Sequence, residues 1–107
     1  MKQQRDGSWR EDATVTLESH KTIPWMIEHR LTARPHDVCI EKKSRFGSRW
    51  LPVTVSDFHA DTQRISRGLI GLGMRPGDSL AIFAATSAEW SRVDVAALHA
   101  GVVVVPI

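Results

Sequence analysis

The residues most able to do chemistry in this sequence are histidines, and their spacing forms no recognisable site. The five are His20, His29, His36, His59 and His99. None follows the His-Glu-x-x-His pattern that puts two metal ligands on one face of a helix. The adjacent pair Glu28–His29 would point in different directions on a helix, because neighbours in sequence do not share a face. We therefore predict no metal site and expect these histidines at the surface or in interfaces.

The single cysteine and a group of glycines also invite functional readings. Cys39 lies in a predicted strand, where a small buried apolar side chain is more common than a nucleophile. Its lack of an intramolecular partner fits a reducing cytoplasm. The glycines, which could be mistaken for a phosphate loop, are Gly68, Gly71, Gly73 and Gly77. They end a helix before a strand, whereas the dinucleotide fingerprint follows a strand and opens a helix.

Four tryptophans could form an aromatic cage or a base-stacking platform. Trp25, Trp50 and Trp90 instead occupy positions in predicted elements that favour packing, and Trp9 lies near the N-terminus. The net charge of +2 comes from fourteen basic and twelve acidic residues, although the sequence pI is about 9.1. The densest basic stretch, 42–45, reads as a solvated hairpin tip. We predict no nucleic-acid partner beyond weak, salt-sensitive binding.

Length and composition indicate one globular unit. The chain has 107 residues, of which 42% are apolar and 24% charged, as in ordinary folded domains. No apolar run approaches the roughly 18–20 residues that span a bilayer. The polar start, residues 1–6, has no apolar stretch behind it and predicts no secretory signal. We expect a cytoplasmic protein, with peripheral contact to the inner membrane face as a variant.

The first half of the chain predicts a leader, a helix and a hairpin. Residues 1–18 are expected to form a flexible leader, with Val15 and Leu17 attached to the body as a short strand. Thr22 can cap a helix that carries Pro24 in its first turn and ends before Pro35. Two strands, over 38–42 and 49–55, are expected to pair as an antiparallel hairpin. Pro52 marks the second as an edge or bulged strand.

The second half predicts a helix followed by a βαβ unit. Ser56 is the expected N-cap of the helix, with Phe58, Ile65, Leu69 and Leu72 on its buried face. Gly73 and Met74 fit a Schellman ending, and residues 75–78 fit a type II turn. Apolar strands over 80–84 and 102–107 flank a helix that a Thr86–Glu89 capping box would start. Trp90, Val93, Ala97 and Ala100 are expected on its buried side.

The fold class is therefore α/β: an N-terminal helix and hairpin, a second helix, and a right-handed βαβ unit. The final strand has nothing after it to cover it. We expect residues 19–107 to be the truncated opening part of a larger α/β domain, with the rest of the polypeptide as its partner. The exposed strand edges at 102–107 and 49–55 also favour self-association.

Several short motifs occur in a telling order. They are Thr22–Pro24 with Arg34–Asp37, Trp50 with Val53–Phe58, Gly68–Ile82, and Glu89–Trp90 with Ala100–Ile107. Together they resemble the N-terminal segment of AMP-forming acyl-CoA synthetases, the adenylate-forming superfamily, and most closely the bacterial long-chain fatty-acid–CoA ligases. Val55 and Asp57 depart from the aromatic and the glutamate that the family favours there, as packing and capping variations.

The resemblance implies a parent enzyme that uses ATP, Mg²⁺ and CoA to convert a fatty acid to its acyl-CoA thioester through an acyl-adenylate. The family's phosphate-binding loop and catalytic lysine have no counterpart in these 107 residues. We therefore assign no catalytic, cofactor-binding or metal residue here and expect the chain alone to be inactive. The alternatives are another adenylate-forming ligase with a different carboxylate substrate, and a freestanding, non-enzymatic α/β binding module.

Overall fold

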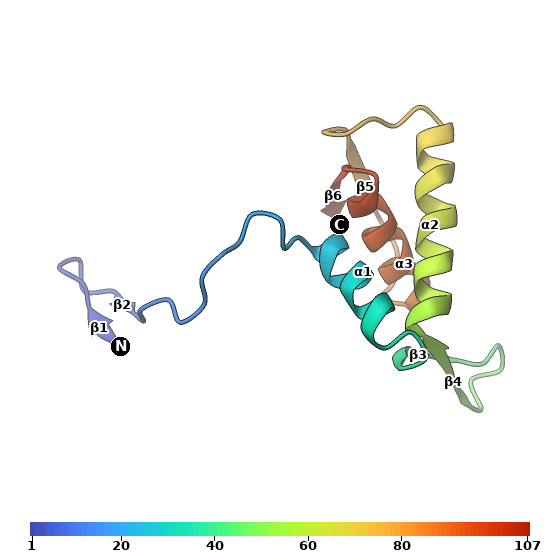
Figure 1. Ribbon diagram of the computed structural model, residues 1–107, viewed down its shortest axis with the longest axis horizontal. Coiled ribbons are helices and arrows are strands. Elements are labelled where there is room, and N and C mark those ends of the chain that lie inside the picture. The colour runs from blue at the N-terminus through green and yellow to red at the C-terminus, as the bar shows by residue number, and fades with distance from the viewer.

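The computed structural model describes residues 1–107 as a three-helix body with two small sheets, and a leader that extends away from it (Figure 1). The elements in chain order are β1 (Lys2–Gln3), β2 (Trp9–Arg10), α1 (Ile23–Ala33), β3 (Val38–Lys43), β4 (Trp50–Thr54), α2 (Val55–Gly71), β5 (Ser79–Ile82), α3 (Ala88–His99) and β6 (Val103–Pro106). The α/β fold class predicted from the sequence is confirmed.

The leader does not attach to the body in the way that the sequence predicted. β1 and β2 pair with each other as a two-residue antiparallel ladder, far from the helices in Figure 1. Val15 and Leu17 lie in no strand and are 75% and 95% exposed. The predicted strand there is wrong, because a short alternating segment forms a strand only where a partner edge is within reach.

Local signals set both ends of α1 as expected. The Thr22 hydroxyl accepts a hydrogen bond from the Trp25 N–H at 3.3 Å, and Pro24 lies in the first turn. The helix ends at Ala33, before Arg34 leaves helical geometry next to Pro35. No residue of α1 is fully buried, whereas α2 and α3 both contain buried residues, so α1 is the most loosely attached of the three helices.

The start of α2 is earlier than predicted. Thr54, not Ser56, is the N-cap, and its hydroxyl accepts from the Asp57 N–H at 3.1 Å. The Val55 and Ser56 N–H groups donate to the carbonyls of Asp37 and Pro35, both at 2.9 Å. The turn before β3 therefore supplies acceptors for two of the orphan donors of α2, and the helix begins where those acceptors are.

The hairpin β3–β4 is confirmed. Its bulge lies in β3, whereas Pro52 led us to expect an edge or a bulge in β4. The ladder runs from Lys43 opposite Trp50 to Val38 opposite Thr54, with a register shift between Val38 and Ile40. Cys39 is the extra residue of this bulge, and Pro52 pairs in register with Glu41. Cys39 is exposed, which corrects the prediction of a buried residue, because a bulge breaks the alternation of faces.

Two small polar residues, Thr62 and Ser66, lie on the buried face of α2 beside Val55 and Phe58, and the sequence pattern missed them. Thr62 and Ser66 are 0% and 4% exposed, whereas Leu72, expected on the buried face, is 85% exposed. On α3 the most buried residues are Ala96 and Ala97, both 0% exposed. α2 and α3 pack directly on each other, and small side chains allow that close approach. Phe58 is buried as predicted.

α2 and α3 end in the same way. The Met74 N–H donates to the Leu69 carbonyl at 3.1 Å and the Gly73 N–H to the Ile70 carbonyl at 2.9 Å, which is the predicted Schellman motif. α3 repeats it, with bonds from Val102 to Ala97 and from Gly101 to Leu98. Both motifs bring an apolar residue back to the core cluster, which contains Ala97, Ala100 and Val102, with Leu69 and Met74 packed against it.

The connection after α2 meets the end of α3. Residues 75–78 form the predicted type II turn, with Gly77 at φ +89° and a 3.0 Å bond from the Asp78 N–H to the Arg75 carbonyl. The Gly77 N–H then donates to the Gly101 carbonyl at 2.9 Å. A Cβ on Gly101 would lie 3.1 Å from the Pro76 Cβ, so the turn and the end of α3 are in direct contact.

The βαβ unit is confirmed, with two differences of detail. β5 and β6 pair in parallel, from Ser79 opposite Val103 to Ile82 opposite Pro106. α3 is capped by Ser87, whose hydroxyl accepts from the Trp90 N–H at 3.1 Å, so the predicted Thr86–Glu89 box is wrong by one residue. The second difference is the extent of the strands, which are Ser79–Ile82 and Val103–Pro106 where 80–84 and 102–107 were predicted. Helices cover the sheet on one face only, since Val103 is 53% exposed.

Glycine substitutions test this arrangement. Gly101→Ala is expected to lower the free energy of unfolding by about 1–3 kcal/mol, because φ is +73° and the new Cβ meets Pro76. Gly73→Ala should lower the free energy of unfolding by less. Its positive φ strains the backbone in the same way, but the new Cβ would have no atom within 4 Å. The control Gly68→Ala, inside α2 with nothing within 4 Å, should stabilise by about 0.5–1 kcal/mol. Urea unfolding measures all three, and equal effects at positions 101 and 73 would contradict the contact.

Candidate functional site

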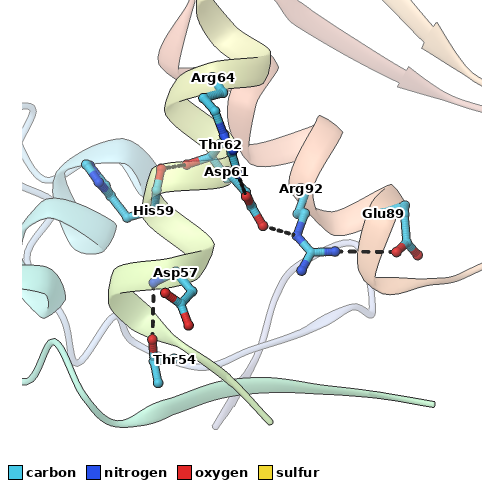
Figure 2. A network of polar contacts seen from close by, with 8 residues as sticks. All are labelled: Thr54, Asp57, His59, Asp61, Thr62, Arg64, Glu89 and Arg92. Carbon is cyan, nitrogen blue, oxygen red and sulfur yellow. Dashed lines mark hydrogen bonds and ion pairs between the residues drawn. The ribbon is translucent and has the colours of Figure 1, made fainter. Parts of the chain in front are cut away.

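The densest polar cluster lies between α2 and α3 and centres on Arg92. Arg92 Nε lies 3.0 Å from Asp61 Oδ2, and its Nη1 lies 3.4 Å from Glu89 Oε1 (Figure 2). Asp61 also pairs with Arg64 one turn along α2. The Arg92 side chain is only 11% exposed, and its Nε has no hydrogen-bond acceptor in good geometry. The contact with Asp61 is therefore mainly an attraction between charges.

The hydrophobic pattern of the sequence did not indicate Arg92, although a weak signal was present. Arg92, Ala96 and His99 recur at i, i+4 and i+7, so they share the side of α3 that faces α2. Asp61 is half-buried on α2, where it neutralises Arg92. This cluster compensates a buried charge between two helices, and nothing in it is arranged as a nucleophile with a base.

A second cluster joins all three helices. His59 Nε2 of α2 lies 2.6 Å from Glu28 Oε1 of α1. The His59 and His99 rings meet edge to face, with centroids 6.0 Å apart. Gln63 Nε2 lies 3.3 Å from His99 Nδ1. Burial lowers the pKa of His99 below 6.5, His59 adds to this lowering, and the charge of Glu28 opposes it.

The other histidines lie apart from this junction. His29 stacks on Trp25 with centroids 5.0 Å apart, and His20 meets the edge of the same indole. Glu28 and His29 thus point to different neighbours, as their adjacency predicted. His36 is exposed in the turn before β3. No group of three or more His, Cys, Asp or Glu side chains is arranged to hold a metal ion.

Cys39 has the surroundings of an unreactive thiol despite its exposure. Partial desolvation raises the pKa of the Cys39 thiol, and the positive charge of Arg30 opposes that shift. A raised pKa keeps the thiol protonated at neutral pH, and the thiolate is the nucleophilic form. The expectation of a cysteine without a nucleophilic role remains compatible with these surroundings, although its predicted burial was wrong.

The glycines and tryptophans serve local structure. Gly73 and Gly77, at φ +97° and +89°, close the helix end and the turn described above. Gly68 and Gly71 lie within α2. Of the tryptophans expected in packing positions, Trp25 and Trp90 are half-buried, whereas Trp50 is 61% exposed. The predicted packing is thus confirmed for Trp25 and Trp90 but not for Trp50, which lies at the end of β4 next to the hairpin loop.

A cleft of about 570 Å³ opens between the hairpin and the first turn of α3. Its lining residues are Ile40, Glu41, Lys43, Trp50, Thr86, Ser87, Ala88, Glu89 and Ser91. The Lys43 ammonium lies 5.4 Å from the centre of the Trp50 ring. The charged groups of the cleft are this lysine, which already contacts the indole, and the carboxylates of Glu41 and Glu89. Because the two signs are mixed, the cleft selects neither an anion nor a cation. None of the three helices has the length and apolar character of a membrane-spanning segment.

Solved structures place this arrangement in a class of proteins. The fatty acyl-adenylate ligase of Legionella pneumophila, solved with acyl adenylate and pyrophosphate, superposes with a TM-score of 0.71 at 19% identity, over 78% of this chain and 14% of that one. A fatty acyl CoA synthetase of Mycobacterium tuberculosis gives 0.65 at 26% identity, over 78% and 16%. The fold is therefore the one that these ligases share over this part of their chains.

The sequence comparisons are more specific. Long-chain-fatty-acid–CoA ligase FadD15 of Mycobacterium bovis is 41% identical over 95 residues, which is 89% of this chain and 16% of the relative. A model of the family described as AMP-binding enzyme matches residues 27–107. The chain belongs to the AMP-binding enzyme family, which confirms the resemblance drawn from the motifs. It spans about a sixth of the length of the two FadD15 relatives, from Mycobacterium bovis and Mycobacterium tuberculosis, that it matches.

The Arg92 cluster gives a matched pair of variants. Asp61→Asn is expected to lower the free energy of unfolding by about 1–3 kcal/mol, because it leaves the buried guanidinium without its nearer counter-charge. Glu89→Gln is the control: Glu89 is 70% exposed and farther away, so the change should stay within about 0.5 kcal/mol. Urea unfolding at neutral pH measures both, and equal losses would show that Asp61 is not the main partner of Arg92.

Proposed function

We propose that this chain is the opening scaffold of an AMP-forming long-chain fatty-acid–CoA ligase. The observation that carries the proposal is the 41% identity over 95 residues to a ligase of that class, together with the family match over 27–107. The chain's role is structural: it supplies the βαβ unit and the helices packed on it. No nucleophile–base pair and no metal-ligand group in the chain argues for a catalytic role within it.

In the proposed reaction, a fatty-acid carboxylate oxygen attacks the α-phosphorus of ATP, bound with Mg²⁺. The bond between the α-phosphorus and the oxygen that bridges it to the β-phosphorus breaks. Pyrophosphate departs, and an acyl-adenylate remains. The thiol of CoA then attacks the acyl carbon and displaces AMP, which gives the thioester. Such steps depend on positioning and on stabilisation of developing charge. The packed α2–α3 pair and the short parallel strands are rigid elements suited to hold the catalytic loops of the remaining polypeptide.

The geometry supports one orientation of this scaffold. In open α/β sheets, ligands bind outside the carboxyl ends of the parallel strands. β5 and β6 run in the same direction and end at Ile82 and Pro106. The proposed substrates therefore lie beyond these two residues. A cytoplasmic location is part of the proposal, supported by a single cysteine with no disulfide partner in the chain.

Enzyme assays test the proposal. The full-length protein that carries this chain should release pyrophosphate from ATP and form acyl-CoA with palmitate far faster than with acetate. The 107-residue chain alone should give no turnover above a blank without protein. Preference for acetate or an aromatic acid would support the alternative, a ligase with another carboxylate substrate. Turnover by the chain alone would overturn the scaffold role.

We also propose that the isolated chain associates with a second copy of itself through the β5–β6 sheet, or through the outer edge of β4. The first route is favoured by the apolar side chains that the single layer of helices leaves open. Exposed fractions are 53% for Val103, 43% for Val105 and 75% for Ile107. Parallel sheets are normally covered on both faces, and unpaired strand edges template further pairing.

A pair of lysine variants tests the self-association. Val103→Lys is expected to shift the isolated chain towards monomer, because a charge would be buried in the contact. Val38→Lys, on β3, is the matched control, since Val38 is 54% exposed but lies outside the β5–β6 sheet. Light scattering coupled to size exclusion reports the mass. A monomeric parent chain, or equal effects of both variants, would show that this sheet is not the contact.

A further inference from the structure

The junction of the three helices contains polar groups that no role described so far explains. Glu28 reaches it from α1, His59 and Gln63 from α2, and His99 from α3. α1 contacts both α2 and α3 and lies beside this pair in Figure 1. The Glu28–His59 contact is the single hydrogen bond or ion pair that joins α1 to either of the other helices.

Protonation of His99 is unfavourable in this geometry. If the Gln63 amide donates to Nδ1, the ring proton lies on Nε2, which is buried and has no partner. If the amide is reversed, Nδ1–H donates to the Gln63 carbonyl oxygen, and Nε2 is a buried acceptor without a donor. An imidazolium has two N–H groups, and only one can find an acceptor in Gln63. The second would remain buried and unsatisfied.

The groups around His99 determine whether the second N–H of its imidazolium could find a partner within the junction. His59, whose ring meets that of His99 edge to face, is already in contact with Glu28 at 2.6 Å. Glu28 is the one anion facing the junction, and His59 competes with His99 for it. Burial outweighs the attraction of Glu28 in its effect on His99. Water is therefore the better partner for an imidazolium at position 99.

We propose that this junction makes the docking of α1 pH-sensitive: neutral His99 packs against His59 beneath α1, and protonated His99 favours a state in which α1 has separated and the ring is hydrated. α1 is the element that yields, because none of its residues is fully buried. α2 and α3 stay together, because they share the most buried residues of the body. The inference does not depend on the proposed ligase function.

The direction of the effect follows from proton linkage. The docked state holds His99 at a lowered pKa, so the undocked state binds more protons once the pH falls below the ordinary histidine value of about 6.5. The docked state therefore keeps its full stability above that pH. It loses stability as the pH falls from there towards the lowered pKa of His99.

Two measurements on the 107-residue chain test the proposal. In an NMR titration of the histidine rings, His99 should titrate below the ordinary histidine value of about 6.5. In hydrogen–deuterium exchange corrected for intrinsic rates, the amides of α1 should exchange several-fold faster at about pH 5.5 than at about pH 7.5. The amides of α2 and α3 should change less between these two conditions.

Two variants isolate His99 as the cause. His99→Gln replaces the ring by an amide that stays neutral and can still bond Gln63, so the pH dependence of α1 exchange should largely disappear. His36→Gln removes an exposed histidine outside the junction and should leave that dependence intact. A His99 ring that titrates at or above about 6.5 would overturn the proposal even if His99→Gln failed to fold. So would α1 exchange that responds equally to pH in His99→Gln and the parent chain.

Discussion

The close packing of α2 on α3 is the contact on which the rest of the body depends. Thr62 and Ser66 on one helix and Ala96 and Ala97 on the other are almost completely buried, and small side chains let two helix backbones approach each other. Thr62 fits this position because its hydroxyl donates to the His59 carbonyl of its own helix at 2.8 Å. The apolar core beside this contact is small. The arrangement of the body therefore depends largely on how closely these two helices pack.

That approach has consequences at both sides of the contact. It brings Asp61 against Arg92, and it brings His59 against His99. Both pairs are polar groups withdrawn from water, and both persist because a partner lies within reach. They differ in what compensates them. Arg92 has two carboxylates, whereas His99 has an amide and a neighbouring histidine, which leaves one of its ring nitrogens unsatisfied.

The ends of α2 and α3 also position the two strands of the parallel sheet. α2 and α3 both end in Schellman motifs, and the type II turn after the first packs on the glycine that closes the second. This contact between Pro76 and Gly101 aligns the starts of β5 and β6, so that Ser79 faces Val103 in the parallel ladder. The register of the sheet is therefore set by how two helices end.

The amino-acid sequence alone determined the features that depend on near neighbours along the chain. Thr22 and Pro24 set the start of α1, Gly73 and Met74 set the end of α2, and residues 75–78 set the turn. The order of such signals also identified the family. In each case the donor, the acceptor or the permitted dihedral angle belongs to residues a few positions apart.

Tertiary structure decided what depends on groups distant in sequence. α2 begins at Val55 because carbonyls of Pro35 and Asp37 accept its first N–H groups. Cys39 is exposed because the register of β4 against β3 makes it a bulge. Arg92, His59 and His99 acquired their partners only when three helices met. Hydrophobic periodicity favours bulky residues and cannot identify these positions, because burial here follows from close approach between backbones and from compensation of charge across helices.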